Sequence, residues 1–200
     1  MRLRAGFGWA TMLRQYVSRH RDKGAGSMMT LYDAFVPGCV QILGSVLGLI
    51  EKAKAHCDEQ SIPHEKLIDA RLAPDMFGFA YQVKSCAVHS AGAIEGVRNG
   101  HFSPDMTQPP GSFEGLTAKI TAALDALRAL NADEIEPLSG KQIIFTIGDK
   151  FCMEFTGKDF LTSFSQPNFY FHATTAYNIL RMSGVAIGKR DYLGAVRVVP

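Results

Sequence analysis

A stripe of apolar residues in the first third of the chain limits the fold more than any other feature of the sequence. Its members recur at alternating steps of four and three residues: Phe35, Cys39, Ile42, Val46, Leu49 and Ala53. This spacing places them on one side of an α-helix that faces a core. Thr30 followed by Asp33 has the pattern of an N-terminal capping box, whereas Pro37 should kink the helix or delay its regular start. We therefore predict a long bundle helix from Leu31 to about Glu59.

Similar patterns predict three more helices and one hairpin. The expected helices are Pro74 to Gly100, Ser112 to Leu130 and Pro167 to Gly184. Before the last helix, apolar residues alternate in two short runs: Ile143, Phe145 and Ile147, then Phe151, Met153 and Phe155. Alternation on both sides of a turn predicts a β-hairpin that serves as a lid or cap. The expected fold is therefore mainly α, a four-helix bundle with one small β-hairpin between helices 3 and 4.

Composition excludes several classes of protein. The 200 residues are 46% hydrophobic and 20% charged, which suits one globular domain with a real core. The sequence contains no uninterrupted apolar run of the roughly 18–20 residues that a membrane span needs, so we expect no membrane partner. Residues 1–27 hold six basic residues against one acid, which leaves 15 basic and 18 acidic residues in the rest. A mildly acidic domain does not attract phosphate backbones, and we expect no nucleic-acid partner.

The basic segment at the start stands apart from the helical pattern that follows it. Residues 1–28 are interpreted as a basic N-terminal arm that is flexible or results from an incorrectly assigned start, and residues 29–200 as the bundle domain. The arm has the Arg-rich, acid-poor composition of a transit peptide or a surface-seeking helix. The four cysteines are widely separated and form no CxxC pair, so neither a closed zinc site nor a thioredoxin-like motif is indicated. We expect a reducing, cytoplasmic environment.

Three sequence strings resemble a known family. They are RLAPDMFGFAYQVKSC (Arg71–Cys86), QPNFYFHATTAYNILR (Gln166–Arg181) and GVAIGKRDYLG (Gly184–Gly194). Together they resemble an uncharacterised "domain of unknown function" family of bacteria and fungi within the DinB/YfiT-like superfamily. The resemblance implies an antiparallel four-helix bundle, often a homodimer, with no established activity for this branch. Some DinB-like relatives are metal-dependent enzymes, including thiol transferases, whose ligands are a His on the second helix and a His-x-x-x-His pair on a later one.

This chain departs from that ligand pattern. His89 and His172 match two of the three ligand positions, but the residue four after His172 is Ala176. A catalytic divalent site usually needs three protein ligands and an open position. We therefore predict no tight metal site and no cofactor, with His89 and His172 as weak candidates for zinc or nickel. On the simpler interpretation, both histidines are partly buried and satisfied by hydrogen bonds.

Polar residues also lie beside the apolar faces of the second and fourth helices. They are Gln82, Ser85 and His89 on one helix and Asn168, His172 and Thr175 on the other. If the two helices are neighbours, these stripes converge on a small pocket, and with Tyr177 they are the candidate ligand-binding residues. The alternative is a buried polar network that fixes the helix register and binds nothing. Phe169, Tyr170, Phe171 and Tyr177 also fit core and dimer contacts.

Two functions from different classes remain. The first is a homodimeric module that binds a small molecule or a partner and holds no tight metal. The second is a degenerate or unusual DinB-like enzyme, of thiol transferase or hydrolase type, that uses His89 and His172. The missing third ligand favours the first hypothesis.

Removing the arm tests the domain boundary. A chain that starts at Met29 should keep the helical circular-dichroism signal and the melting temperature of the full chain, because residues 1–27 contribute no stripe to the core. A fall of many degrees in the melting temperature would show instead that the arm docks on the domain.

Overall fold

A computed structural model describes residues 28–149 and 151–199 of the chain. The predicted arm, apart from its last residue, lies outside the described residues. The helices are α2 (Leu31–Gln60), α3 (His64–Ile68), α4 (Phe79–Val88), α5 (Ala91–Asn99), α6 (Phe113–Arg128), α7 (Ala132–Ile135), α8 (Gly157–Asp159), α9 (Gln166–Met182) and α10 (Lys189–Leu193). A short 3₁₀ helix spans Glu136–Leu138, and a π-helix spans Phe160–Ser165. The strands are β1 (His101–Phe102), β2 (Gln142–Ile147) and β3 (Phe151–Thr156).

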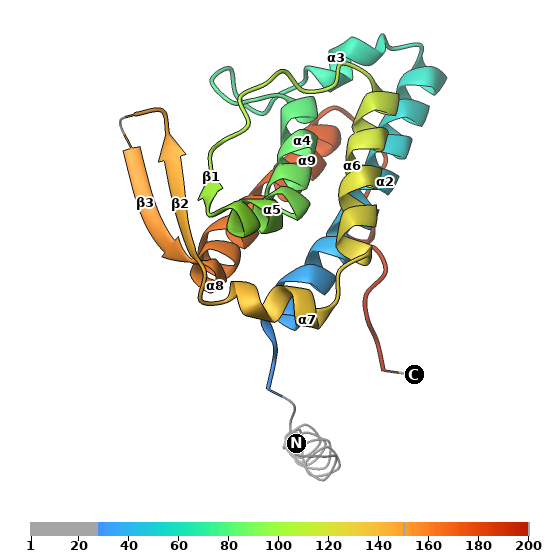
Figure 1. Cartoon of the computed structure of the whole chain (residues 1–200). Coiled ribbons are helices and arrows are strands. Elements are labelled where there is room, and N and C mark those ends of the chain that lie inside the picture. The colour runs from blue at the N-terminus through green and yellow to red at the C-terminus, as the bar shows by residue number, and fades with distance from the viewer. Residues whose placement is uncertain (1–27, 150, 200) are drawn as a thin grey trace, which may run out of the picture.

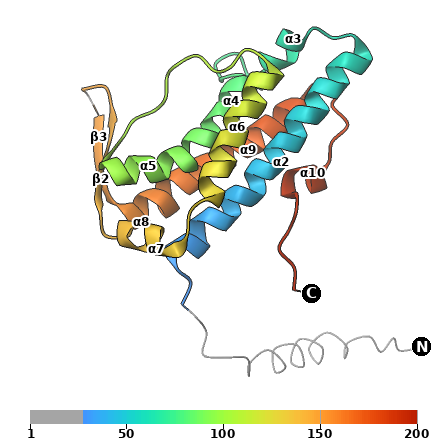
Figure 2. The ribbon, with the colours of Figure 1, turned by 45° about the vertical axis from the view of Figure 1, so that its right-hand side comes forward.

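Four helical rods form an antiparallel bundle. Helices α2 and α9 run in one direction, while α4 with its continuation α5, and α6, run in the other (Figures 1 and 2). Helix α2 packs against α6 and α9, and α4 packs against α9 and α6. Since α5 and α6 follow each other in sequence and run the same way, the chain must cross the length of the bundle between them. The predicted mainly α, four-helix fold is confirmed.

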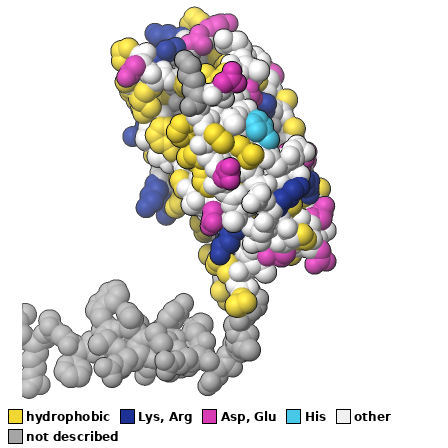
Figure 3. All heavy atoms as spheres, turned by 60° about the vertical axis from the view of Figure 1, so that its left-hand side comes forward, with side chains coloured by type: hydrophobic (Ala, Val, Ile, Leu, Met, Phe, Trp, Pro, Cys, Tyr) yellow, Lys and Arg dark blue, Asp and Glu magenta, His cyan; other side chains and the backbone are white. Residues whose placement is uncertain are grey.

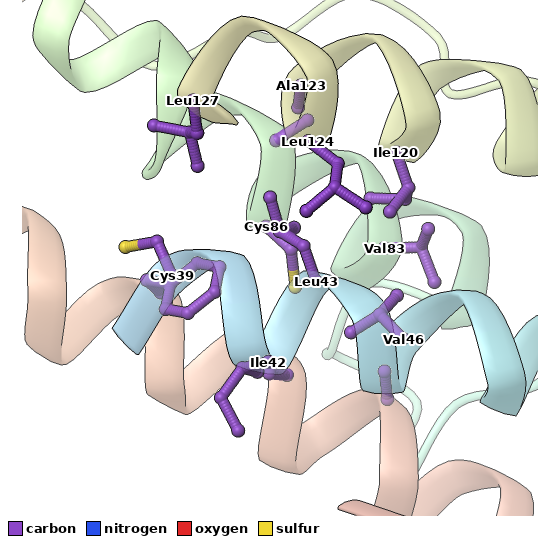
Figure 4. Close-up of a cluster of buried hydrophobic side chains, with 14 of the residues drawn as sticks. Cys39, Ile42, Leu43, Val46, Val83, Cys86, Ile120, Ala123, Leu124 and Leu127 are labelled. Atoms are coloured by element: carbon purple, nitrogen blue, oxygen red, sulfur yellow. The ribbon is translucent and has the colours of Figure 1, made fainter. Parts of the chain in front are cut away.

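The core fills the space between these rods. The apolar stripe of α2 meets Val83 and Cys86 of α4 and Ile120 and Leu124 of α6 (Figure 4). Each of these four side chains is buried, with at most 2% of its surface exposed. Removing such side chains from water supplies roughly 1.5–3 kcal/mol for each large one, which is the main force that holds the rods together.

The start of α2 is fixed by contacts from nearby and from far along the chain. The predicted capping box is present, because Thr30 Oγ1 accepts from Asp33 N–H and the Asp33 carboxylate accepts from Thr30 N–H. The Glu136 carboxylate, more than 100 residues away, accepts from Leu31 N–H at 3.1 Å and Tyr32 N–H at 2.9 Å. Helix α2 begins at Leu31 and continues through Pro37, so the expected delay in its start is wrong.

The second helix differs from its prediction at both its start and its middle. Pro74 lies in the segment before the helix, which begins only at Phe79, and the rod is interrupted between Val88 and Ala91. At the break, Ser90 leaves helical geometry with φ −116° and ψ −95°, and its hydroxyl donates to the carbonyl of Cys86 at 2.6 Å. A serine side chain that bonds to the preceding turn competes with the regular helix, which the apolar spacing alone does not reveal. The rod ends as predicted, with Gly100 in the left-handed region at φ 74°.

The predicted hairpin is part of a larger sheet. Strands β2 and β3 pair antiparallel with Phe145 opposite Met153, and β1 adds to β2 in parallel with Phe102 opposite Phe145. The result is a three-stranded mixed sheet in the order β1-β2-β3, so the predicted hairpin is present and has a third strand beside it. Two residues are too few to show alternation, and β1 therefore left no signal in the sequence.

Helix α2 is long and apolar enough to cross a membrane by length and composition, although its polar residues interrupt any continuous apolar run. Half of the most apolar window is buried inside the domain. Burial in the bundle accounts for that composition, because a helix that buries a broad face in the core is also rich in apolar residues.

Glu136→Ala should destabilise the domain. The substitution leaves two N–H groups at the start of α2 without their acceptor and removes a negative charge from the positive end of the helix dipole, so we expect a loss of about 1–2 kcal/mol in the free energy of unfolding. Urea unfolding followed by circular dichroism measures this change. Glu59→Ala, at an exposed position in the last turn of the same helix, serves as the control and should change the stability by less than about 0.5 kcal/mol. Equal effects of the two substitutions would contradict the cap.

Candidate functional site

The two candidate histidines meet where α4 packs against α9. His89 is the C-cap residue of α4, directly before the break in the rod, and His172 lies in the second turn of α9. Their rings are nearly parallel, with the centroids 5.5 Å apart and an angle of 18° between the planes. Both side chains are half-buried, so part of each ring stays in reach of solvent. The two polar stripes meet here, where His172 contacts both His89 and Gln82.

A chain of hydrogen bonds sets the tautomer of His172. The Gln82 amide Nε2–H donates to the carbonyl of Phe77 at 2.9 Å, which leaves Gln82 Oε1 as an acceptor. His172 Nδ1 lies 2.7 Å from that oxygen and must therefore carry the proton and donate. The lone pair of His172 then resides on Nε2. Gln82, itself buried, thus makes Nε2 of His172 a hydrogen-bond acceptor.

Both imidazoles are neutral at physiological pH. Burial lowers the pKa of His172 from 6.5 to about 4. Burial, together with repulsion from His172, lowers the pKa of His89 from 6.5 to about 3. The second effect arises because two charged rings at this separation would repel each other. The site is therefore a pair of uncharged rings, and hydrogen bonding fixes the tautomer of His172.

Aromatic rings continue from the histidines along the surface of the bundle. Tyr81 lies edge-on to His172 with the centroids 6.3 Å apart, and Phe77 stacks on Tyr81 at 3.9 Å. On the other side, Phe164 lies 6.1 Å from His89, and Phe171 lies 5.3 Å from His172. Seen from the side of the sheet, hydrophobic side chains gather in a patch on the surface (Figure 3). The histidine pair is thus set in an aromatic surface on which a flat molecule can pack.

Two of these site residues depend on irregular backbone. Ser165, at the end of the π-helix, is fully buried, and its Oγ lies 3.3 Å from His89 Nδ1. The helix break places His89 at the end of α4, where its ring can reach Ser165. Neither irregularity leaves a periodic signal, and the sequence analysis therefore missed Ser165 and the rings of Phe77, Tyr81 and Phe164.

The other candidate residues lie outside the hydrogen-bonded group. Ser85 is buried on α4 and contacts Tyr81 one turn before it, where its hydrogen bond lowers the pKa of the phenol against the larger, opposite effect of burial. Asn168 Nδ2 donates to the carbonyl of Phe164 at 2.8 Å, in the π-helix that directly precedes α9. Among the described residues, none of the hydrogen bonds joins Thr175 to either histidine, although Thr175 is buried on α9. Tyr177 packs edge-on against Tyr192 of α10, with the centroids 6.0 Å apart, and does not join the pair.

A buried lysine holds the loop that passes this site. Lys84 is 1% exposed, and its ammonium group donates to the carbonyls of Asp105 and Thr107 and lies 3.1 Å from an Asp105 carboxylate oxygen. A buried charge needs such partners, because an unpaired one would cost several kcal/mol. The loop thereby brings Met106 to the hydroxyl of Tyr81, at 3.9 Å. Sequence analysis missed this lysine because it occupies an ordinary helical position.

The donor atoms do not fit the metal centre of DinB-like enzymes. Within residues 28–149 and 151–199 no group of three or more His, Cys, Asp or Glu side chains is placed to hold a metal ion. The third ligand position of the family pattern is Ala176, whose side chain is fully buried in the core. Two imidazoles alone bind a divalent ion weakly.

Comparisons with known proteins agree with the four-helix fold. A family model described as a domain of unknown function, DUF1993, matches residues 31–193. The chain belongs to the DUF1993 family. This DUF1993 protein is similar to the crystal structure of a DinB family member protein from Shewanella denitrificans, with a TM-score of 0.73, 26% identity, and coverage of 85% of this chain and 95% of that chain. No curated protein matches the chain.

The neutral histidines predict how stability depends on pH. Each binds a proton more readily in the unfolded chain, where its pKa is near 6.5, than in the folded one. Lowering the pH from about 7 to about 5 should therefore reduce the free energy of unfolding by about 1–2 kcal/mol for each histidine, because only the unfolded state takes up the protons. His172→Gln should make this dependence shallower, as measured by urea unfolding at several pH values. His101→Gln, at an exposed histidine of β1, should keep the wild-type slope.

Proposed function

We propose that this DUF1993 protein is a binding module for a small, flat molecule that carries a hydrogen-bond donor. The observation that carries the proposal is the fixed tautomer of His172, whose Nε2 is an acceptor because Gln82 holds the proton on Nδ1. Aromatic rings beside the histidines offer a packing surface, and a single directed polar atom in an apolar setting is typical of small-molecule sites. Tyr81 and Phe77 would contact the ring of the ligand, and His172 would accept from its N–H or O–H group.

Binding agrees better with this geometry than acid–base catalysis does. A general base works best when its pKa lies near the operating pH. The pKa values of about 3 and about 4 leave both histidines neutral but only weakly basic at pH 7. Neutral imidazole nitrogens still accept hydrogen bonds well, and they do so without the cost of burying a charge.

The proposed module is also a homodimer. Support comes from large apolar side chains that are about half exposed on the sheet and on α9: Ile147, Phe151 and Phe171. A second copy would remove these side chains from water. Phe171 also packs edge-on against His172, so the proposed dimer surface and the ligand site adjoin at that residue.

Indole and 1-methylindole form a matched pair of probes for the histidine site. They have nearly the same shape, but only indole has an N–H group to donate to His172. The wild-type protein should bind indole about fivefold more tightly, the effect of one neutral hydrogen bond. His172→Phe, which keeps an aromatic ring and removes the acceptor, should bind both probes equally. NMR titrations that follow the ring protons of the histidines measure the two affinities.

Controls separate the possible failures. His101→Phe makes the same change at an exposed histidine of β1 and should keep the preference for indole. Equal binding of the two probes by the wild-type protein would exclude the acceptor, and a preference that survives His172→Phe would place it elsewhere. Elemental analysis of the same samples addresses the metal-dependent alternative. Stoichiometric zinc or nickel that is lost in His172→Phe would overturn the binding module in favour of the enzyme.

A further inference from the structure

The outer face of α2 carries two adjoining grooves that the histidine site does not use. One groove, of about 1010 Å³, lies between α2 and α6, and the other, of about 610 Å³, lies between α2 and the C-terminal segment around α10. Figure 2 shows α2 between these two walls. Gly44 and Gly48 line both grooves. We call the combined feature the α2 trough.

Three arginines belong to the smaller of the two grooves. Arg128, at the end of α6, and Arg190 and Arg197, in the C-terminal segment, all line the smaller groove. In the described part of the chain none of the ion pairs engages Arg190 or Arg197, and the nearest carboxylate oxygen to Arg128 is at 3.9 Å. The other two charged groups of this groove, Lys52 and Asp191, neutralise each other at 2.5 Å. The groove therefore has an excess of positive charge in a domain whose net charge is negative.

The C-terminal segment, which carries Arg190 and Arg197, is held against α2 by specific contacts. Gln41 Nε2–H donates to the carbonyl of Leu193 at 2.8 Å. Gly194, in the left-handed region at φ 60°, packs so closely on Ser45 that a Cβ there would overlap the serine hydroxyl. These contacts set the position of the backbone between Arg190 and Arg197, so the positive groove is built into the fold.

The two glycines connect the smaller groove to the larger one, whose lining combines apolar residues with Glu51, Lys54, Glu114 and Asp125. A Cβ at Gly44 or Gly48 would have no atom within 4 Å, so the surface of α2 is low at both positions. Beyond them lie Leu47 and the small side chains of Ala118 and Ala122 on α6. At 1.5 Å per helical residue the larger groove follows α2 from Gly44 to Lys54 for about 15 Å, enough for an extended alkyl chain.

We propose that the α2 trough binds a single-chain amphipathic anion. Its phosphate or carboxylate head lies between Arg128, Arg190 and Arg197, and its alkyl chain passes over Gly44 and Gly48 into the groove between α2 and α6. Arginine suits such heads because its guanidinium group donates two parallel hydrogen bonds to them. The two volumes, about 610 and 1010 Å³, are of the size found for small-molecule sites, which favours such a ligand over a protein surface.

Dodecyl phosphate and butyl phosphate test the two halves of the trough separately. Both carry the same head, and only the dodecyl chain reaches beyond the glycines. Isothermal titration calorimetry of the full chain, below the micelle concentration, should show dodecyl phosphate binding at least about tenfold more tightly, since burial of each CH₂ group adds affinity. Raising the salt concentration should weaken binding of both probes, because the arginines are exposed.

Variants identify which residues hold which part of the probe. Gly48→Leu fills the passage and should remove most of the advantage of the longer chain, whereas butyl phosphate, which is held mainly by the arginines, should lose less affinity than dodecyl phosphate. Leucine is also a better helix former than glycine, so this variant should fold. The double variant Arg190→Gln/Arg197→Gln should weaken both probes by about tenfold or more, through loss of charge-assisted hydrogen bonds. Arg98→Gln, at an arginine paired with Glu95 on α5, is the control and should bind like the wild type.

Several results would overturn the proposal. Failure of the wild-type protein to bind dodecyl phosphate would do so, as would a chain-length advantage that Gly48→Leu leaves unchanged. Binding only to vesicles of anionic phospholipid, and not to the free amphiphile, would assign the arginines to a membrane surface instead. A dimer that dissociates in the double arginine variant, seen by light scattering, would make the trough a contact between copies.

Discussion

Burial of the apolar side of α2 is the constraint on which the rest of the structure depends. Helix α2 runs for 30 residues, and its stripe is covered by α6, α9 and α4 together. A helix held from several sides must also have its start satisfied, because the first N–H groups have no partner within the helix. The Glu136 carboxylate supplies that partner, and Gln166 Nε2–H donates to the carbonyl of Ala34 at 2.9 Å. The other segments of the bundle therefore contact α2 at its N-terminus as well as along its apolar side.

The histidine pair exists because two rods depart from regular geometry. The break between α4 and α5 places His89 at a helix end, and the π-helix before α9 places Ser165 beside it. Irregular turns of this kind are common at functional sites because they aim side chains that a regular helix would direct elsewhere. The neutral state of both rings then follows from their burial beside aromatic neighbours, and with it the acceptor at His172 that a ligand could use.

The long connection before α6 shows how a buried charge can organise a loop. Two consecutive rods run in the same direction, so the chain must return along the outside of the bundle. Lys84, almost fully buried, binds two carbonyls and one carboxylate of this connection. Without the connection, the buried Lys84 ammonium would lack hydrogen-bond partners, which costs free energy. Without Lys84, the connection would lose the contacts that hold it against α4. Their combination fixes the surface beside Tyr81, where the histidine site meets the solvent.

The sequence by itself determined the helices, most of their ends and the family of the fold. Caps such as Thr30, Ser112 and Gly100 act within one turn, and apolar periodicity acts within one helix. Both can therefore be recognised from a short segment of the sequence.

The sequence also placed polar residues on the facing sides of two rods. Only the tertiary structure decided which of them meet. Gln82 and His172 bond across 90 residues, while Asn168 bonds to Phe164, only four residues before it in the chain. The same holds for the α2 trough, whose arginines come from α6 and the C-terminal segment. Such contacts depend on how the rods pack and on where their helical geometry is interrupted. Packing brings together residues that are far apart in sequence, so a local sequence pattern cannot predict these contacts.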